Sequence, residues 1–135
     1  MEQTSLDTFL PKCIDRNCSI IIGGAYNSGI LATGVSEKGP WNYNYVPAPE
    51  DVVRKVAAIE GLCAEFSIPL AAAALQFPLA HSAVASVIPG IGNVQRIDQT
   101  LNLFTTKIPD EFWQALSERG LIRDDAPTPA SNAGE

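Results

Sequence analysis

Two glycine-rich segments are the strongest candidates for chemistry, because each directly follows a run of apolar residues. Residues 23–29 read Gly-Gly-Ala-Tyr-Asn-Ser-Gly, and residues 90–93 read Gly-Ile-Gly-Asn. Glycines let backbone N–H groups approach an anion, and Asn93 can cap a helix whose N-terminus attracts negative charge. Arg96, one turn further on, could pair with a phosphate. The spacing is neither GxGxxG nor a P-loop, so a phosphate site and ordinary strand-to-helix turns both remain open.

Other reactive side chains form no catalytic set. Trp41, Tyr43 and Tyr45 alternate with asparagines, which fits either a lid that stacks on a ring-shaped ligand or an extended segment with one aromatic face on the core. His81 has no carboxylate near it in sequence, so we expect it to cap helix carbonyls rather than act as a general base. Ser28 does not lie in a GxSxG motif. We therefore predict no catalytic residue.

The cysteines predict neither a disulfide framework nor a metal site. Cys13, Cys18 and Cys63 are an odd number, and none of their spacings is CxxC. His81 is the single histidine, so a metal ligand set is not expected. We expect three reduced cysteines, buried as small apolar residues in a cytoplasmic protein.

Composition limits the possible partners. The chain has 135 residues, 46% of them hydrophobic, and a formal net charge of −6 from 9 Lys+Arg and 15 Asp+Glu. This length predicts one domain. Its acidity argues against nucleic-acid binding, which needs a basic face. No apolar run reaches the ~18–20 residues of a membrane span, and the first residues lack the features of a signal peptide.

The elements that must position these residues alternate between helices and short apolar runs. Residues 4–17 predict a helix with one apolar face, and Pro11 should kink it or displace its start. The β-branched run at 19–22 predicts a strand buried on both faces, and residues 24–49 predict a long loop. A helix is expected at about 50–66, followed by a buried helix at 70–79 that begins at Pro69 and bends or ends at Pro78. The helix at about 50–66 is expected to turn six residues inward, namely Val53, Val56, Ala57, Leu62, Cys63 and Phe66.

The remaining third of the chain repeats this alternation. Residues 84–89 predict a second buried strand, and a helix should run from Asn93 to about residue 104. Pro109 should open a last helix, through residue 119, that turns Phe112, Trp113 and Leu116 inward. Residues 120–135 are expected to form a mobile tail. The pattern predicts an α/β fold with parallel strands, although two such strands cannot make a stable sheet by themselves.

Several stretches together resemble the aldo-keto reductases. Residues 25–34 resemble the loop after strand seven of that family, and residues 84–90 resemble its strand eight. Arg96 falls where the family has an arginine for the cofactor phosphate. Residues 6–11, 43–45, 73–79, 112–113 and 126–129 extend the likeness, which is strongest to the D-threo-aldose 1-dehydrogenase branch with its L-fucose and pyridoxal dehydrogenases.

The resemblance implies a partial (β/α)8 TIM barrel over residues 1–135, with strands seven and eight and their surrounding helices. Such barrels typically have ~250 residues, and the likeness covers only the carboxyl-terminal portion. The catalytic Asp, Tyr, Lys and His of the family have no matching position in this sequence. We therefore expect the 135-residue chain by itself to be inactive as an enzyme.

The resemblance also implies half of a site for NAD or NADP. Tyr26 would stack on the nicotinamide, and Asn27, Ser28, Gly29 and Leu31 would lie along the pyrophosphate. The adenosine side would be lined by Gly90, Ile91, Gly92 and Asn93, with Arg96 at the ribose or its 2′-phosphate and Gln99 and Thr100 near the adenine. Many NADPH-preferring members have a lysine at the position of Gly90, so a strict preference for NADP is not expected.

Three functions follow as alternatives. The first is the carboxyl-terminal portion of an NAD(P)-dependent oxidoreductase, whose sugar or aldehyde substrate would bind only the complete enzyme. The second is a non-catalytic remnant that self-associates through unpaired barrel edges. The third is an independent nucleotide-binding module. The first alternative implies a nicotinamide dinucleotide and a missing amino-terminal half as partners. The second implies a second copy of the chain, and the third implies a nicotinamide dinucleotide alone.

Overall fold

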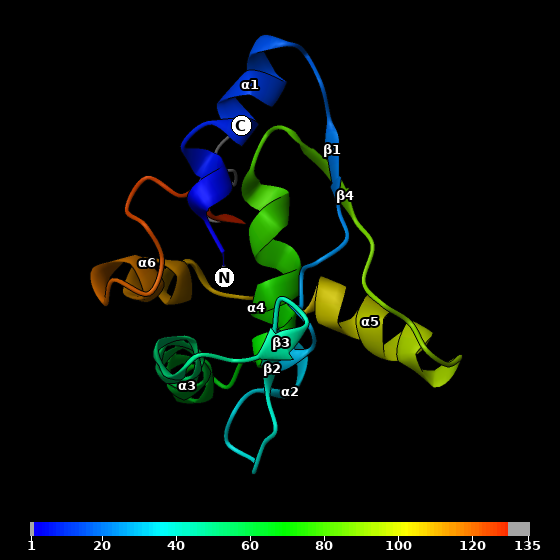
Figure 1. Ribbon diagram of the computed structural model, residues 1–135, viewed down its shortest axis with the longest axis vertical. Coiled ribbons are helices and arrows are strands. Elements are labelled where there is room, and N and C mark those ends of the chain that lie inside the picture. Colours follow the sequence, from blue (N-terminus) through cyan, green and yellow to red (C-terminus); the bar gives the residue numbers. More distant parts are fainter. Residues whose placement is uncertain (1, 130–135) are drawn as a thin grey trace.

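A computed structural model provides the fold, and residues 2–129 of the chain are described. Figure 1 shows a branched arrangement, in which a two-stranded ribbon and helix α5 extend from a group of packed helices. The elements in chain order are η1 (Thr4–Leu6), α1 (Phe9–Asp15), β1 (Ile20–Ile22), α2 (Ile30–Thr33), β2 (Asn42–Tyr43), β3 (Val46–Pro47), α3 (Glu50–Glu65), α4 (Leu70–Gln76), η2 (Phe77–Ala80), β4 (Val84–Val87), α5 (Gln95–Thr105) and α6 (Asp110–Glu118).

The two predicted strands pair in parallel, which confirms the α/β class. In β1 and β4, Ile20 pairs with Val84 and Ile22 with Val87, with a register shift after Ile20. The expectation that β1 is buried on both faces is wrong, because Ile21 is 63% exposed. Ile20 and Ile22 line a hollow on the side of α4 and η2. No described element covers the opposite side, where Ile21 meets solvent.

The core lies between α3, α4 and α6 (Figure 1). Trp113 and Phe112 of α6 are fully buried, as their spacing predicted, and they contact each other edge to face at 5.1 Å between ring centroids. α3 buries Val56, Ile59, Leu62 and Cys63. The expected burial of Ala57 is wrong, because Ala57 is exposed. The buried face of α3 instead includes Ile59, two residues further along the helix. This cluster supplies most of the apolar burial in the described residues.

The turn between α3 and α4 sets the direction of the second helix. Pro69 precedes the first residue of α4 with an extended ψ of 127°, so the helix begins one residue later than expected. Pro78 converts the end of α4 into the tighter η2, as predicted. No described helix is by itself long and apolar enough to cross a membrane, and α3 with α4–η2 meets that length and composition only as a pair bent by 105°.

The amino-terminal helix is shorter than the apolar pattern predicted. Residues 4–17 divide into η1 and α1, and Pro11 lies in the first turn of α1, where its missing N–H has no helical partner to lose. Pro11 thus displaces the start of the helix, one of the two predicted outcomes. Leu10 and Cys13 are buried, but Phe9 and Ile14 are more than half exposed. The predicted apolar face is therefore only partly covered.

Residues 24–49 contain more structure than the expected loop. They include the single-turn helix α2, whose Ile30 and Leu31 are buried, and a hairpin formed by β2 and β3. The predicted number of strands, two, was therefore too low, because the hairpin adds β2 and β3. These two strands have only two residues each.

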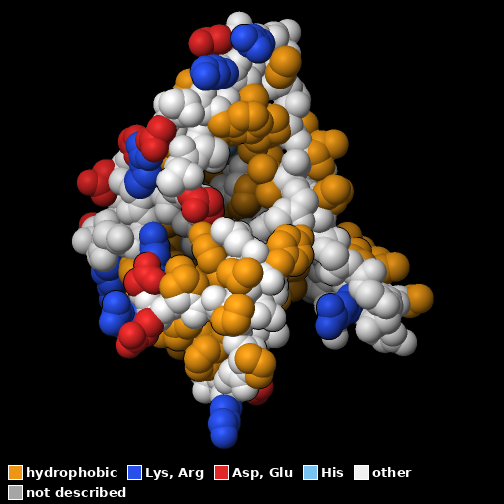
Figure 2. All heavy atoms as spheres, viewed as in Figure 1, with side chains coloured by type: hydrophobic (Ala, Val, Ile, Leu, Met, Phe, Trp, Pro, Cys, Tyr) orange, Lys and Arg blue, Asp and Glu red, His pale blue; other side chains and the backbone are white. Residues whose placement is uncertain are grey.

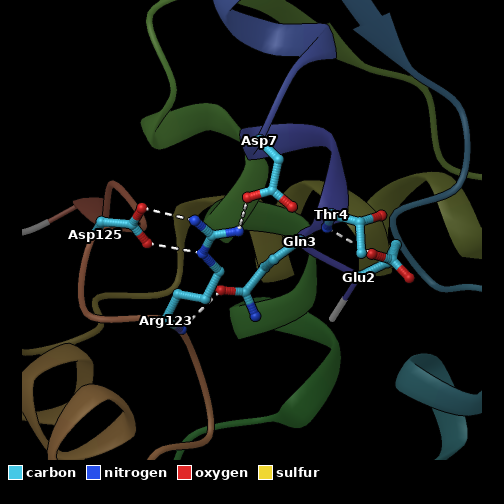
Figure 3. Close-up of polar contacts among 6 residues, drawn as sticks. All are labelled: Glu2, Gln3, Thr4, Asp7, Arg123 and Asp125. Atoms are coloured by element: carbon cyan, nitrogen blue, oxygen red, sulfur yellow. Dashed lines mark hydrogen bonds and ion pairs between the residues drawn. The ribbon is translucent and has the colours of Figure 1, made fainter.

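The two ends of the described chain meet at Arg123. Figure 3 shows its guanidinium between Asp7 and Asp125, and its backbone N–H donates to Gln3 Oε1 at 2.8 Å. Leu121 and Ile122 just before it are buried in the core. The mobility expected for residues 120–135 stays a prediction, and residues 130–135 lie outside the described part.

The cysteines differ in exposure, which corrects the expectation that all three are buried. Cys13 and Cys63 are buried, but Cys18 is exposed. Burial, with a smaller contribution from the Glu60 charge, raises the pKa of Cys63 to about 11. Because the thiolate is the nucleophile, we expect iodoacetamide at pH 8 to modify Cys18 in the native chain and to leave Cys63 unmodified until urea is added. Peptide mapping by mass spectrometry would measure this, and native labelling of Cys63 at the rate of Cys18 would contradict it.

Candidate functional site

The two glycine-rich segments begin side by side at one edge of the β1–β4 pair. The Ile88 N–H donates to the Ile22 carbonyl at 2.8 Å, immediately before both segments start. Parallel strands point their carboxyl ends the same way, and such an edge is where α/β folds bind ligands. The predicted juxtaposition of residues 23–29 and 90–93 therefore has a structural basis in the pairing.

The first segment is a left-handed backbone turn. Asn27, Ser28 and Gly29 have φ values of +41°, +58° and +95°. The Tyr26 carbonyl accepts the N–H groups of Gly29 and Leu31, which closes the turn onto α2. Three consecutive positive φ values are unusual for a sequence with one glycine, and such backbone conformations concentrate at functional sites.

Two side chains of this turn hold the tip of the β2–β3 hairpin. Asn27 Oδ1 accepts the Asn44 N–H at 2.9 Å, and Ser28 Oγ accepts the Tyr45 N–H at 2.8 Å. Both bonds use oxygens as acceptors, so the Asn27 amide N–H groups and the Ser28 hydroxyl proton are left to donate elsewhere. The turn therefore keeps two side-chain groups that can donate hydrogen bonds, as an anionic ligand requires.

The aromatic residues at positions 41, 43 and 45 differ in burial, so they do not all fit one of the two alternatives, a lid or a segment packed on the core. Trp41 packs partly buried against the core, as the structural alternative predicted. Tyr45 instead is 94% exposed at the hairpin tip with a φ of +64°. Tyr43 lies between these extremes and donates from its hydroxyl to Glu2 at 3.3 Å.

Tyr26 is anchored on the core at the start of the turn. Its ring packs against the central cluster, and its hydroxyl is buried without a hydrogen-bond partner among the described residues. Burial raises the pKa of this phenol, so it stays neutral at physiological pH. An unsatisfied buried hydroxyl costs about 1–3 kcal/mol, which makes Tyr26 a candidate for contact with a bound group.

Leu31 is fixed more deeply than the other predicted residues of this segment. Its side chain is 2% exposed and belongs to the central cluster. It therefore anchors α2 to the core, and any ligand contact would have to come from its backbone or its edge. Its position along a pyrophosphate stays a prediction.

The second segment is open to solvent. An added Cβ at Gly90 or Gly92 would meet no atom within 4 Å, so there is room for a ligand against this backbone. Asn93 Oδ1 accepts the Arg96 N–H at 3.0 Å, which confirms Asn93 as a cap, although α5 itself begins at Gln95. Ile91 and the Arg96 side chain are exposed, and Arg96 forms no ion pair with any described residue.

Helix α5 shares a hollow with α2. The hollow has a volume of about 660 Å³, and its wall includes Thr33 from α2 and Gln99 from α5, together with residues of α3 and α4. Thr100, the other predicted adenine neighbour, is partly buried on the same helix. The structure thus places Gln99 in one hollow with Thr33 of α2, and it leaves Arg96, Gly90 and Gly92 exposed to solvent.

Two residues that support the site were not anticipated from the sequence. Glu60 Oε2 accepts the N–H groups of Val35 and Ser36, which fixes the chain after α2. Gln76 Nε2 donates to the carbonyls of Leu103 and Thr106, both at 2.9 Å, which fastens the end of α5 to α4. One feature of the sequence could have indicated the role of Gln76, since it is a single amide in an otherwise apolar run.

His81 occupies the predicted place at the end of a helix but makes a different hydrogen bond. It follows η2, and its Nδ1 accepts the Ala83 N–H at 3.1 Å rather than donating to carbonyls. This bond belongs to the turn into β4, and it gives His81 no catalytic partner among the described residues.

Comparisons with known proteins identify the family that this chain resembles. A family model described as the aldo/keto reductase family matches residues 7–119. Pyridoxal 4-dehydrogenase of Microbacterium luteolum is 39% identical over 122 residues, which cover 90% of this chain and 35% of that protein. D-threo-aldose 1-dehydrogenase of a Pseudomonas species is 32% identical over 129 residues, or 96% of this chain and 38% of that protein. The chain thus spans little more than a third of the length of these relatives.

Proposed function

Because the chain belongs to the aldo/keto reductase family, we propose that its two glycine-rich segments form the pyrophosphate and adenosine part of a nicotinamide dinucleotide site. The observation that carries this proposal is their common origin at one edge of the β1–β4 pair, fixed by the bond from Ile88 to Ile22. The family has a TIM barrel fold, in which ligands bind at the carboxyl ends of the strands. The described part is consistent with a partial barrel.

The first segment supplies donors to the pyrophosphate in this proposal. The Asn44 and Tyr45 N–H groups bond to the oxygens of Asn27 and Ser28, so the amide and hydroxyl groups can still donate to the pyrophosphate. Charge-assisted hydrogen bonds of this kind contribute about 1.5–3 kcal/mol each. Tyr26 would contact the nicotinamide ring from its anchored position, and Gly29 would allow the backbone to approach.

The second segment holds the adenosine end. Gly90 and Gly92 leave the backbone accessible, while Ile91 and Asn93 line the approach and Arg96 provides the positive charge. With Gly90 in place of a lysine, Arg96 carries the charge interaction alone, so a strict preference for NADP is not expected. Gln99 and Thr100 complete the adenine side.

The complete enzyme in this proposal is an NAD(P)-dependent oxidoreductase of an aldehyde or sugar. When bound, the nicotinamide supplies or accepts the hydride of that reaction. Pyridoxal and aldoses are the substrate classes proposed, because the two relatives are named for them. The residues of this chain bind and orient the dinucleotide, and no described residue is proposed to transfer a proton.

Titration of NADH with the purified 135-residue chain tests the proposal. We expect a saturable change in NADH fluorescence, and we expect Arg96→Gln to weaken the binding of NADPH, which carries the 2′-phosphate, about tenfold or more because a charge-assisted contact is lost. Arg54→Gln is the matched control, since Arg54 is exposed on α3 and, among residues 2–129, forms an ion pair only with Glu50. Unchanged fluorescence with the native chain, or equal weakening by both substitutions, would contradict cofactor binding at this edge.

A further inference from the structure

The tip of the β2–β3 hairpin is a tight turn of two residues. Tyr43 pairs with Val46, and the residues between them, Asn44 and Tyr45, have φ values of +49° and +64°. Positive φ at both central residues is the mark of a type I′ turn, in which asparagine and glycine are favoured. A tyrosine is unfavourable in this conformation, so contacts outside the hairpin must help to hold the tip.

Both backbone N–H groups of the tip donate to the first glycine-rich segment. The Asn44 N–H bonds to Asn27 Oδ1 at 2.9 Å, and the Tyr45 N–H bonds to Ser28 Oγ at 2.8 Å. Asn27 and Ser28 also have positive φ values, so four non-glycine residues in the left-handed conformation meet at this contact. Since such conformations persist only where their surroundings hold them, each side of the contact stabilises the other.

The rest of the hairpin is fastened to the protein independently of its tip. The Ala48 N–H donates to the Trp41 carbonyl at 2.9 Å, and both side chains pack against the central cluster. Tyr43 reaches Glu2 through its hydroxyl. Figure 2 shows hydrophobic side chains gathered over the hairpin on this face of the molecule. The hairpin is therefore a mostly apolar arm that carries two polar N–H groups to the first segment.

An anion bound at the first segment would complete a chain of hydrogen bonds that starts at the hairpin tip. The Tyr45 N–H donates to Ser28 Oγ, and the hydroxyl group can donate onward to a phosphate oxygen. Bonds in such a chain polarise and strengthen one another. Asn27 acts in the same way, because a backbone N–H can bond only to the amide oxygen and leaves the amide nitrogen for the ligand. The docked tip and a bound anion therefore favour the same arrangement of both side chains.

We propose that the hairpin tip and the dinucleotide bind the first segment cooperatively. The docked tip presets the side chains of Asn27 and Ser28, and the bound pyrophosphate in turn tightens the tip. Undocking frees both side chains to rotate, and a ligand must then order them again. The coupling is reciprocal, because the factor by which docking raises the affinity is also the factor by which the ligand favours docking. This inference rests on the cofactor site proposed above and adds Asn44 and Tyr45 to it as positioning residues.

Insertion of two glycines between Asn44 and Tyr45 tests the coupling in the purified 135-residue chain. The longer tip withdraws both N–H groups, and we expect NADH to bind about tenfold more weakly, because binding must then order two side chains. The same insertion between Glu37 and Lys38, which are exposed in the loop before the hairpin, is the matched control. It should change the affinity less than about twofold, since exposed loops tolerate insertions. Far-UV circular dichroism of each variant checks that it is folded.

Amide hydrogen exchange followed by NMR gives a readout that a merely structural role of the hairpin would not change. Saturating NADH should slow exchange of the Asn44 and Tyr45 N–H groups about tenfold, the same factor as the loss of affinity on insertion. The Gly120 N–H, which bonds to the Ser117 carbonyl at the end of α6, should be unaffected. Ser28→Ala removes the acceptor of the Tyr45 N–H, so it should abolish the slowing at Tyr45 and retain it at Asn44.

The outcomes separate this coupling from the cofactor site itself. A native chain that does not bind NADH would overturn both proposals. A native chain that binds NADH with the same affinity as the variant lengthened at the tip would overturn the coupling alone. The coupling would also be wrong if bound NADH left the exchange of Asn44 and Tyr45 unchanged.

Discussion

Trp113→Ala is expected to lower the free energy of unfolding by about 4 kcal/mol. Trp113 is 1% exposed at the centre of the core, edge to face with Phe112 and stacked with Phe77 at 6.3 Å between ring centroids. Its removal takes away a large apolar area and leaves a cavity between α3, α4 and α6. Because small domains are stable by about 5–15 kcal/mol in total, this loss would remove a quarter or more of the stability.

Trp41→Ala is the matched control, since Trp41 packs only partly buried against the same cluster. It should lose roughly 1–2 kcal/mol, because less of its surface leaves water. Urea denaturation followed by far-UV circular dichroism, at one fixed protein concentration, measures both. Equal losses for the two tryptophans would show that the core is not centred on Trp113.

Gly34→Ala is expected to destabilise the chain by about 2 kcal/mol. Gly34 is buried with a φ of +74°, and a Cβ there would lie 2.3 Å from Glu60 Oε1. The Glu60 side chain is flexible, but it cannot move away without losing its bonds to the Val35 and Ser36 N–H groups, at 2.9 and 3.1 Å. Backbone strain and the loss of these two bonds therefore act together.

Gly61→Ala provides a control of opposite sign. Gly61 lies inside α3, where an added Cβ would meet nothing within 4 Å. Alanine should stabilise the helix by roughly 0.5–1 kcal/mol, because it loses less backbone entropy on folding. The same urea titrations separate the two glycines, and a stabilised Gly34→Ala variant would show that the Glu60 contact does not constrain the turn.

The elements that sequence patterns predicted are those whose signal is local. Three of these signals each predicted the segment in which they lie. They are the period of apolar residues in α3 and α6, the β-branched run of β1 and the prolines around α4. The exposure of Ile21 could not be predicted in this way, because burial of a strand face depends on which element covers it. The same limit applies to α5, which was predicted as a helix but which buries no residue.

The candidate site was predictable in its location but not in its internal support. Parallel strands ending in glycines placed both segments at one edge, and the capping role of Asn93 followed from its residue type. The hydrogen bonds from Asn44 and Tyr45 to Asn27 and Ser28 join residues 17 positions apart, and no pattern in either segment indicates them. The helix α2 was missed because it is a single turn that begins from positive φ values at non-glycine residues.

The contact between Arg123 and the first residues of the chain has a consequence for folding. Gln3 and Arg123 are 120 positions apart in sequence, and the buried Leu121 and Ile122 lie next to this contact. Closing a loop of this length costs conformational entropy before the contact can stabilise the chain, and contacts of such long range slow folding. Until the loop closes, the helices that pack on Leu121 and Ile122 expose apolar surface on which chaperones would act.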